Sequence, residues 1–272
     1  MKDDLGDRMK LYEQADAGKR LVPLLPACAR LDGRNFSRLT KEMERPYDPD
    51  MSSAMTHTAQ WIAEQTNARM AYTQSDEINL VWCSEEYGSQ IFFDGKIHKM
   101  VSVLAAMVSM KFFEYCEDSF FLMRKIGRRS LPVFDCRVWN VPTRDEAANV
   151  FLWREKDATK NSISMAASQF YSHKQLHGKT GKEKQEMLFQ KGVNWNDYPD
   201  FFKRGTFIQR TKVMRRFTQE ELDKIPEAHQ PDPETEIERT EYKICPMPPF
   251  SKVLNRPGVI LDGAEPEIWM LI

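Results

Sequence analysis

Hydrophobic residues recur along the first 142 residues in two patterns, as short continuous runs and at intervals of three or four positions. Short apolar runs bounded by turn-forming residues are typical of strands, and apolar residues repeated every three or four positions are typical of amphipathic helices. The order is strand, helix, strand, strand, helix, strand, which predicts an α+β fold with a ferredoxin-like βαββαβ core. We expect the strands at residues 24–31, 69–73, 78–83 and 133–141, and the helices at residues 51–66 and 96–116.

This topology predicts a meeting point for acidic side chains. In the ferredoxin-like fold the third strand lies between the first two and runs antiparallel to both. The end of the first strand therefore lies beside the turn that joins the second and third strands. Asp32 follows the first strand and Asp76-Glu77 lies in that turn. We expect these carboxylates to share one edge of the sheet although they are distant in sequence.

The chain beyond Pro142 divides into two further segments. Residues 143–217 have mostly helical patterning and form an added helical region. Eight of the 15 prolines lie beyond residue 217, so residues 218–272 are expected to form a mostly extended, irregular tail over the core or a neighbouring subunit. The predicted organisation is therefore a core at 1–142, a helical region at 143–217 and a proline-rich tail at 218–272.

The overall charge is nearly balanced, with 39 Lys and Arg against 40 Asp and Glu. This balance excludes a simple polycation, so any nucleic-acid binding must come from a local basic patch. One candidate run contains six basic residues and no acid: Lys203, Arg204, Arg210, Lys212, Arg215 and Arg216. These cations suit RNA phosphates, and the alternative is an ordinary solvated strand face.

The compartment can be predicted from cysteines and hydropathy. The five cysteines are scattered singly, which favours reduced thiols over a disulfide scaffold or a zinc module. The N-terminus has no apolar signal region, and the longest apolar stretch, Met100–Met110, is too short to cross a bilayer. His173 and His177 have the spacing of zinc ligands, but without a third ligand nearby a solvated helix face is favoured. We expect a cytoplasmic protein that does not enter a membrane.

The paired acids have a possible chemical role. Carboxylates at neighbouring strand ends can hold Mg²⁺, and two such ions can activate an attacking hydroxyl and stabilise a leaving oxygen. Arg34, Arg38, Lys41 and Arg45 follow Asp32 closely and could bind triphosphate oxygens. The alternative is that Asp32-Gly33 is an ordinary strand-ending turn and Asp76-Glu77 an ordinary hairpin tip.

Two motifs carry a family resemblance. Arg30–Phe36 (RLDGRNF) resembles the R-[IL]-D-G-R-x-F signature of the tRNA(His) guanylyltransferase family, and Ser75-Asp76-Glu77 resembles its second metal motif. The resemblance covers roughly residues 5 to 215 in order and implies a polymerase-palm fold that adds nucleotides in the 3′-to-5′ direction. Further matching segments are 134–138, 153–154, 157–162, 186–189 and 203–205.

The resemblance also implies roles for individual residues. Asp32 and Asp76 would be the catalytic ligands of two Mg²⁺ ions, assisted by the Gly33 carbonyl. The substrates would be ATP and GTP, with ATP adenylylating a tRNA 5′-monophosphate before the 3′-hydroxyl of GTP displaces AMP. The family works as a homotetramer. The implied nucleotide-binding residues are Asp32, Gly33, Arg34, Asn35, Phe36, Ser37, Lys41, Arg45, Ser75, Asp76 and Asn161.

One departure from the eukaryotic pattern narrows the expected function. Residues 158–163 (ATKNSI) replace the His-Ile-Asn-Asn type motif and resemble the bacterial, archaeal and viral branch. That branch prefers template-dependent additions to 5′-truncated tRNAs. The implied function is therefore templated 3′-to-5′ nucleotide addition at tRNA 5′ ends, for repair or for G−1 addition to tRNA(His). Two alternatives are a palm-type nucleotide cyclase and a non-catalytic RNA-binding protein.

Overall fold

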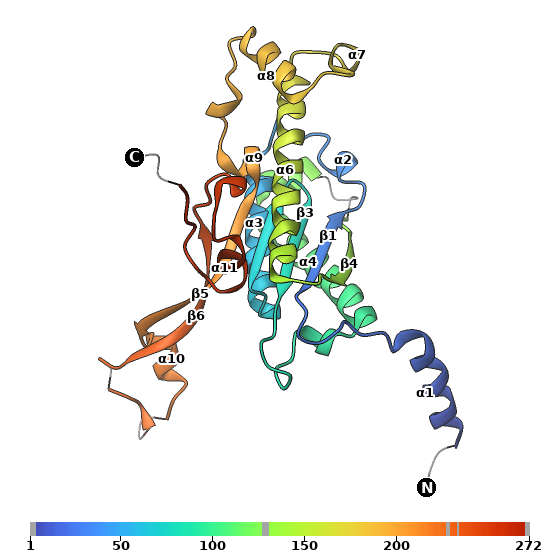
Figure 1. Ribbon diagram of the computed structural model, residues 1–272, viewed down its shortest axis with the longest axis vertical. Helices are drawn as coiled ribbons and strands as arrows, with labels where there is room; N and C mark the ends of the chain where they lie inside the picture. Colours follow the sequence, from blue (N-terminus) through green and yellow to red (C-terminus); the bar gives the residue numbers. More distant parts are fainter. Residues whose placement is uncertain (1–3, 127–130, 227–228, 233, 270–272) are drawn as a thin grey trace.

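The structure is a computed structural model that describes residues 4–126, 131–226, 229–232 and 234–269. The remaining residues, which belong to the first and third predicted segments, lie outside this description. The described residues form an antiparallel six-stranded sheet with the strand order β4-β1-β3-β2-β5-β6 (Figure 1). Its strands are β1 (Ala27–Gly33), β2 (Met70–Gln74), β3 (Glu77–Trp82), β4 (Phe134–Asn140), β5 (Thr206–Arg216) and β6 (Glu236–Cys245).

Helices and short 3₁₀ turns connect and cover these strands. The longer helices are α1 (Asp4–Ala17), α3 (Pro49–Thr66), α4 (Ile97–Asp118) and α6 (Arg144–Ala167). No helix among the described residues is both long enough and apolar enough to span a membrane. The short elements are α2 (Phe36–Leu39), η1 (Phe92–Gly95), α5 (Phe120–Ile126), α7 (His173–Leu176), α8 (Gly181–Phe189), η2 (Trp195–Asp197), α9 (Asp200–Arg204), α10 (Gln219–Asp223), η4 (Phe250–Lys252) and α11 (Arg256–Leu261).

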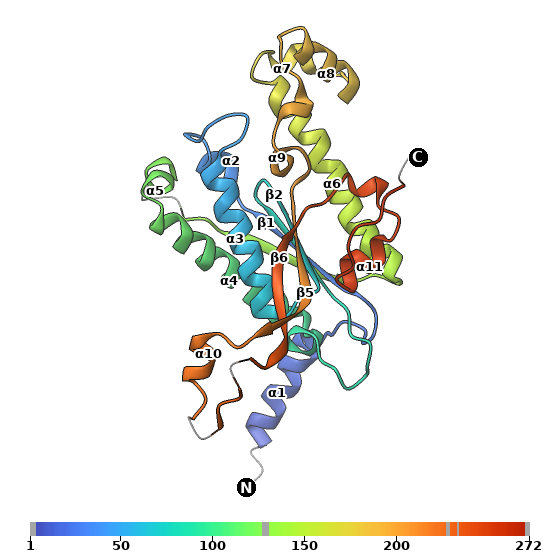
Figure 2. The ribbon, with the colours of Figure 1, turned by 90° about the vertical axis from the view of Figure 1, so that its left-hand side faces the viewer.

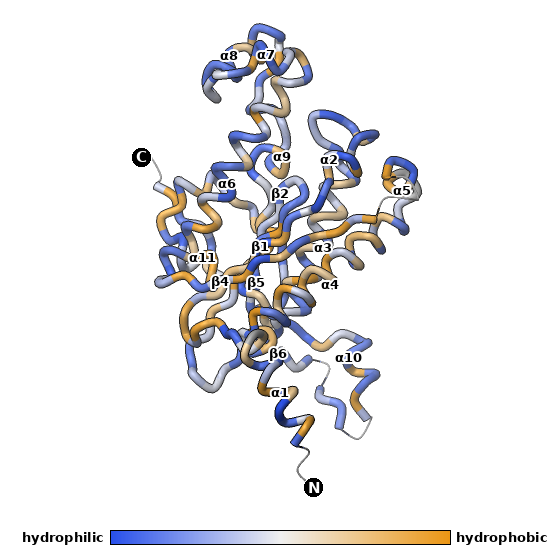
Figure 3. The backbone as a smooth tube through the Cα atoms, turned by 90° about the vertical axis from the view of Figure 1, so that its right-hand side faces the viewer, coloured by the Kyte–Doolittle hydropathy of each residue, from blue (hydrophilic) through white to orange (hydrophobic). Residues whose placement is uncertain are grey.

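The first face of the sheet packs against α3 and α4 (Figure 2). Successive side chains of a strand point to opposite faces, so Ala27, Ala29 and Leu31 of β1 all point into this layer. Helix α3 begins at Pro49 because the side chain of Asp48 accepts hydrogen bonds from the first free backbone N–H groups. Hydrophobic segments gather where these helices meet the sheet (Figure 3).

The opposite face of the sheet packs against α6 and α11. Cys28 of β1 and Tyr72 of β2 point into this second layer, where Phe151 of α6 and Phe207 of β5 are buried beside them. Helix α6 begins after Thr143, whose hydroxyl accepts a hydrogen bond from the backbone N–H of Glu146. The sheet is therefore the middle of three layers, and α6 runs along the face that carries Asp32.

The predicted α+β core and its strand order are confirmed. Strand β3 lies between β1 and β2 and is antiparallel to both. Asp32 is paired with Glu77, and the backbone N–H of Gly33 donates to the carbonyl of Asp76 at 3.0 Å. The structure makes Asp32 and Gly33 the last residues of β1 rather than the turn after it.

The second predicted segment contains both helices and a strand. Helices α6, α7, α8 and α9 agree with the expected helical region, but residues 206–216 form β5 and extend the sheet beyond β2. This strand begins with the buried run Phe207, Ile208 and Gln209, which packs against the existing sheet. The region is therefore mostly helical, and residues 206–216 add a strand at its end.

The third predicted segment is more regular than the expected irregular tail. Strand β6 pairs with β5 over its whole length, and α11 packs Val259 and Ile260 into the core. Residues 236–245 contain no proline, and Pro257 lies in the first turn of α11, so the proline-rich composition concealed a regular strand and a helix. The distal part of the β5–β6 hairpin, with α10, projects from the body (Figure 1).

Candidate active site

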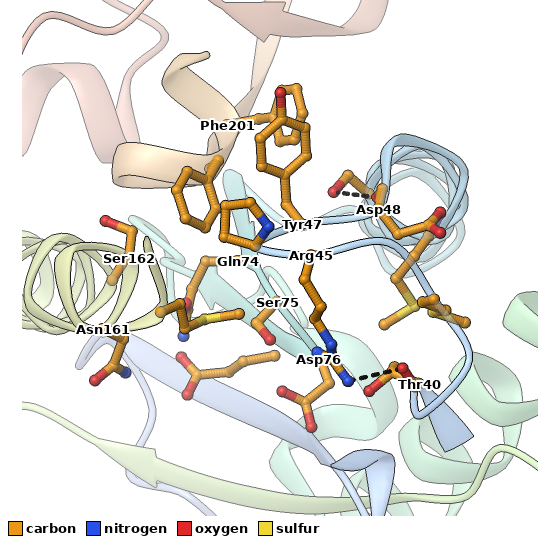
Figure 4. A pocket seen from close by; sticks show the side chains of 18 of the residues that line it. Thr40, Arg45, Tyr47, Asp48, Gln74, Ser75, Asp76, Asn161, Ser162 and Phe201 are labelled. Atoms are coloured by element: carbon orange, nitrogen blue, oxygen red, sulfur yellow. Dashed lines mark hydrogen bonds between the residues drawn. The ribbon is translucent and has the colours of Figure 1, made fainter. Parts of the chain in front are cut away.

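A cavity of about 540 Å³ lies where the β2–β3 turn meets the end of β1 (Figure 4). The loop before α3, helix α6 and helix α9 form its other walls. Five residues that the sequence placed in a nucleotide site line this cavity together: Asp32, Arg45, Ser75, Asp76 and Asn161. Segments separated by more than a hundred residues in sequence therefore converge on one hollow.

The β2–β3 turn positions the first half of the site. Gln74 pairs with Glu77, which leaves Ser75 and Asp76 as the two residues of the hairpin loop. Ser75 has a φ of 51°, a left-handed conformation that lets the chain reverse in so few residues. The hydrogen bond from Gly33 to the carbonyl of Asp76 fixes this turn against β1. Asp32 and Asp76 are thus held at one sheet edge.

The electrostatics of this edge favour a bound cation. Burial raises the pKa of Asp76, and the negative charge of Asp32 raises that pKa further. A backbone hydrogen bond and a hydrogen bond from Ser75 lower the pKa of Asp76, but they offset only part of this rise. Two carboxylates that repel each other in a half-buried site are stabilised when a positive ion neutralises them.

The donor set fits Mg²⁺ better than a metal that needs a full protein cage. Within the described ranges, no group of three or more His, Cys, Asp or Glu side chains is arranged to hold a metal. Asp32 and Asp76 supply hard oxygen ligands, and the adjoining backbone of Gly33 can supply a carbonyl. Mg²⁺ commonly uses one or two carboxylates and takes its remaining ligands from water and phosphate.

Glu77 has a different role from its neighbour Asp76. Arg154 of α6 binds it through two hydrogen bonds, Nε to Oε1 at 2.6 Å and Nη2 to Oε2 at 2.7 Å. Asn79 donates a third hydrogen bond to Oε1 at 2.7 Å. Both members of the ion pair are buried. Glu77 therefore ties α6 to the turn that carries Asp76, and the cavity lies between these two elements.

An aromatic wall closes the side of the cavity away from the carboxylates. Tyr47 packs its ring edge-on against Phe201, with ring centroids 5.2 Å apart, and also contacts Phe202 at 5.0 Å. Met51 and Met165 add apolar surface to the lining. The sequence did not identify these residues as part of the site. Phe201-Phe202 directly precede the matched segment 203–205, but no sequence signal connected them with Tyr47.

Several predicted nucleotide-binding residues lie beside the cavity and do not line it. The ring of Phe36 is buried in the core, 5.0 Å from that of Phe134. A Cβ atom added to Gly33 would lie 2.3 Å from the Phe36 ring, so these two residues pack the end of β1. The remaining four, which are exposed on the loop and on or near α2, are Arg34, Asn35, Ser37 and Lys41.

Arg45 and Asn161 line the cavity from opposite walls. Arg45 donates through Nη2 to the carbonyl of Thr40 at 2.8 Å, and Asn161 donates to Asp157 of α6 at 3.3 Å. Both side chains are exposed, so each is free to turn toward a ligand. Neither pairing involves Asp32 or Asp76.

The basic run predicted to bind RNA has its charges neutralised within the chain. Lys203 and Arg204 bind Asp200 at 3.2 and 2.8 Å, and both are largely buried. On the β5–β6 hairpin, three more cations pair with glutamates: Lys212 with Glu238, Arg215 with Glu221, and Arg216 with Glu234. Only Arg210 of the six lacks an ion pair among the described residues, and its Nε is buried. The run is therefore not a free positive stripe.

Comparison with known proteins places this geometry in context. The family model of tRNA(His) guanylyltransferase matches residues 6–142, and the Thg1 C terminal domain model matches residues 149–246. The chain is 28% identical to tRNA(His) guanylyltransferase of Debaryomyces hansenii over 75% of this chain and 80% of that protein. It is 26% identical to the uncharacterized protein R259 of Acanthamoeba polyphaga mimivirus over 78% of each chain.

Solved structures give the same result. A bacterial tRNA(His) guanylyltransferase-like protein in complex with ATP superposes with a TM-score of 0.69 at 38% identity, covering 76% of this chain and 88% of that one. One in complex with GTP has a TM-score of 0.69 at 32% identity and covers 92% and 95%. Together with the two matched family models, these comparisons show that the chain belongs to the tRNA(His) guanylyltransferase family of nucleotidyltransferases.

Proposed function

We propose that this chain is a template-dependent 3′-to-5′ nucleotidyltransferase that adds nucleotides, chiefly G from GTP, to tRNA 5′ ends. The observation that carries the proposal is the meeting of Asp32 and Asp76 at the floor of a cavity with an aromatic wall. Family members of similar structure are in complex with ATP and with GTP. The cavity has the size range of small-molecule sites and offers carboxylates on one side and apolar surface on the other.

Each wall of the cavity has a task in this proposal. Asp32, Asp76 and the Gly33 carbonyl would hold two Mg²⁺ ions, which when bound activate an attacking hydroxyl and stabilise the leaving oxygen. Arg45 approaches from the opposite loop and neutralises phosphate charge. Tyr47 and Phe201 present flat surfaces that suit a nucleotide base and exclude water from it.

The chemistry consists of two phosphoryl transfers. First, the 5′-phosphate of the tRNA attacks the α-phosphorus of ATP, and pyrophosphate leaves. Second, the 3′-hydroxyl of GTP attacks the 5′-phosphorus of the adenylylated tRNA, loses its proton, and AMP leaves. A tRNA with a 5′-triphosphate enters at the second step and releases pyrophosphate. In such transfers, positioning and charge stabilisation provide most of the rate enhancement.

The proposal includes an assembly and a compartment. A homotetramer would spread one tRNA over several subunits, and light scattering of the purified chain tests it by mass. The scattered single cysteines suit a reducing cytoplasm, in which Cys28 and Cys116 remain buried thiols. Contacts from the Lys203–Arg216 run to RNA would require phosphates to displace the acidic partners of its five paired cations.

The test uses a 5′-monophosphorylated tRNA that lacks its first nucleotide, with Mg²⁺, ATP and labelled GTP. We expect label at the 5′ end with the wild type and none with Asp76→Asn. Asp262→Asn, which removes the carboxylate that pairs with Arg144 at the start of α6, is the matched control and should retain activity. Conversion of free nucleotide without RNA would favour the cyclase alternative. RNA binding with no turnover, unchanged in Asp76→Asn, would favour the non-catalytic alternative.

A further inference from the structure

A second hollow of about 630 Å³ continues from the active-site cavity along α6. Ser164 and Met165 line both cavities, so the two are neighbours on the same helix. The hollow lies where the end of α6 meets α7 and the loop to α8. Figures 1 and 2 show this region at the end of the molecule opposite α1 and α10.

The chemistry of this hollow is cationic and rich in hydroxyls. Its lining includes two imidazoles, His173 and His177, whose ring centroids are 6.0 Å apart, and the ammonium groups of Lys179 and Lys184. Over the described part of the chain, none of the residues that line it carries a carboxylate. Lys184 donates to Ser164 at 3.0 Å, which points its ammonium group toward the boundary with the active site.

The surrounding segment is strongly positive. Residues 160–191 contain six lysines and two glutamates, whereas the whole chain has a net charge of −1. Of the four lining cations and imidazoles, only Lys179 has an ion pair within the described residues, with Glu183 at 3.0 Å. This differs from the Lys203–Arg216 run, where five of six cations are paired. A positive surface near the site is therefore found here and not on β5.

The combined length of the two cavities along α6 distinguishes the phosphates of an RNA strand from those of a single nucleotide. An α-helix rises about 1.5 Å per residue, so the ten residues from Ala158, in the first cavity, to Ser168, in the second, cover about 15 Å. One strand of a nucleic-acid duplex advances about 3.4 Å along the duplex axis for each phosphate, so a strand that runs parallel to α6 covers this distance with about four nucleotides. The three phosphates of one nucleotide held at Asp32 and Asp76 would occupy only part of this span, whereas a strand can follow all of it.

We propose that the hollow between α6, α7 and α8 binds backbone phosphates of the RNA strand whose end enters the active-site cavity. The inference rests on the proposed function, because it assumes that the first cavity holds an RNA 5′ end. His173, His177, Lys179 and Lys184 supply the N–H donors, and the phosphates bind without recognition of base identity. This assigns the RNA grip to the end of α6 rather than to the β5–β6 hairpin.

The test measures the dissociation constant of the 5′-truncated tRNA at several salt concentrations. For Lys179→Gln/Lys184→Gln we expect a dissociation constant at least about tenfold higher and a salt slope smaller by about 1 for each lysine. His173→Ala/His177→Ala is the second variant and should also weaken RNA binding. The matched control is Lys243→Gln, whose lysine is paired with Glu241, and its salt slope should change little. Circular dichroism checks that each variant is folded.

The ATP and GTP affinities of the same variants identify the source of the phosphate. Unchanged nucleotide binding with weakened RNA binding supports the proposal. Unchanged RNA binding and salt slope would overturn it, and loss of nucleotide binding alone would assign the hollow to a triphosphate instead. If the wild type binds RNA but adds no nucleotide, the proposed function fails. The RNA dissociation constants of the wild type and the variants still decide whether the hollow binds RNA.

Discussion

Replacing Arg154 with methionine should destabilise the protein more than the loss of any surface ion pair. Arg154 binds Glu77 through two hydrogen bonds of 2.6 and 2.7 Å, and the two side chains are only 8% and 6% exposed. Without the guanidinium, the carboxylate of Glu77 stays buried next to Asp76, with Asn79 as its remaining partner. Methionine fills similar volume, so the change mainly removes charge and hydrogen bonds.

The magnitude follows from burial. Removal of one partner from a buried ion pair costs about 3–5 kcal/mol, because the other charge is left uncompensated. For a chain of this size, each kcal/mol corresponds to a shift in melting temperature of about 2–4 °C, so we expect a decrease of roughly 6–20 °C. Activity should fall as well, since the same pair ties α6 to the turn that carries Asp76.

Urea unfolding of two comparison variants tests the cause. Arg144→Met removes the surface pair with Asp262, whose side chains are 41% and 46% exposed, and should cost about 1 kcal/mol or less. Glu77→Met/Arg154→Met replaces both charges with apolar groups and should be more stable than Arg154→Met alone. The slope of free energy against urea should be the same for all variants.

Two results would refute this reasoning. The first is a cost for Arg154→Met equal to that of Arg144→Met, which would mean that burial adds nothing to the pair. The second is a double variant as unstable as the single one, which would mean that packing and not uncompensated charge causes the loss.

Three further predictions concern acidic side chains and a glycine. Burial and the charge of Asp32 raise the pKa of Asp76. The stability that this group contributes is therefore present at low pH and is lost as the pH rises through its folded-state pKa. Asp76→Asn should be inactive, but in EDTA at pH 7 urea unfolding should show it to be more stable than the wild type. Burial opposes ionisation of Asp48, but hydrogen bonds from Lys125 and from backbone N–H groups lower its pKa overall. The stability that Asp48 contributes is thus present above its unfolded-state pKa and is lost as the pH falls through the folded-state pKa. Asp48→Ala should lower the free energy of unfolding by about 1–2 kcal/mol at pH 7 and by less at pH 3. Gly205→Ala should unfold at lower urea concentration than Gly192→Ala, because both glycines have positive φ but only at Gly205 would the new Cβ lie 2.6 Å from the carbonyl of Thr73.

The sequence predicted the core of the fold because its signals are local and strong. Alternating and helical apolar spacings identified the strands and the two long helices, and the known topology then placed Asp32 beside Asp76. A two-residue loop and a strand end are short-range features, so few alternatives existed for their arrangement.

Other parts depend on contacts between distant segments, which one sequence does not reveal. Nothing in the pattern indicated that Tyr47 would pack against Phe201, or that Glu77 would bind Arg154. Five of the six cations in the Lys203–Arg216 run have carboxylate partners. Three of these carboxylates lie on or beside the β5–β6 hairpin, so the sequence could not reveal them before the pairing of β6 with β5 was known. The proline-rich composition of residues 218–272 predicted an extended tail, but β6 contains no proline and Pro257 lies in the first turn of α11.

In our proposal, templated addition takes place at the edge formed by Asp32 and Asp76. The most direct measurement gives the protein two 5′-truncated tRNAs that differ only in the base opposite the missing nucleotide, with all four labelled nucleoside triphosphates and Mg²⁺. We predict that the added nucleotide changes with the opposing base to restore a Watson–Crick pair, and that Asp76→Asn adds none. Addition of G to both tRNAs alike would contradict templated addition, and an Asp76→Asn variant as active as the wild type would contradict the role of Asp76.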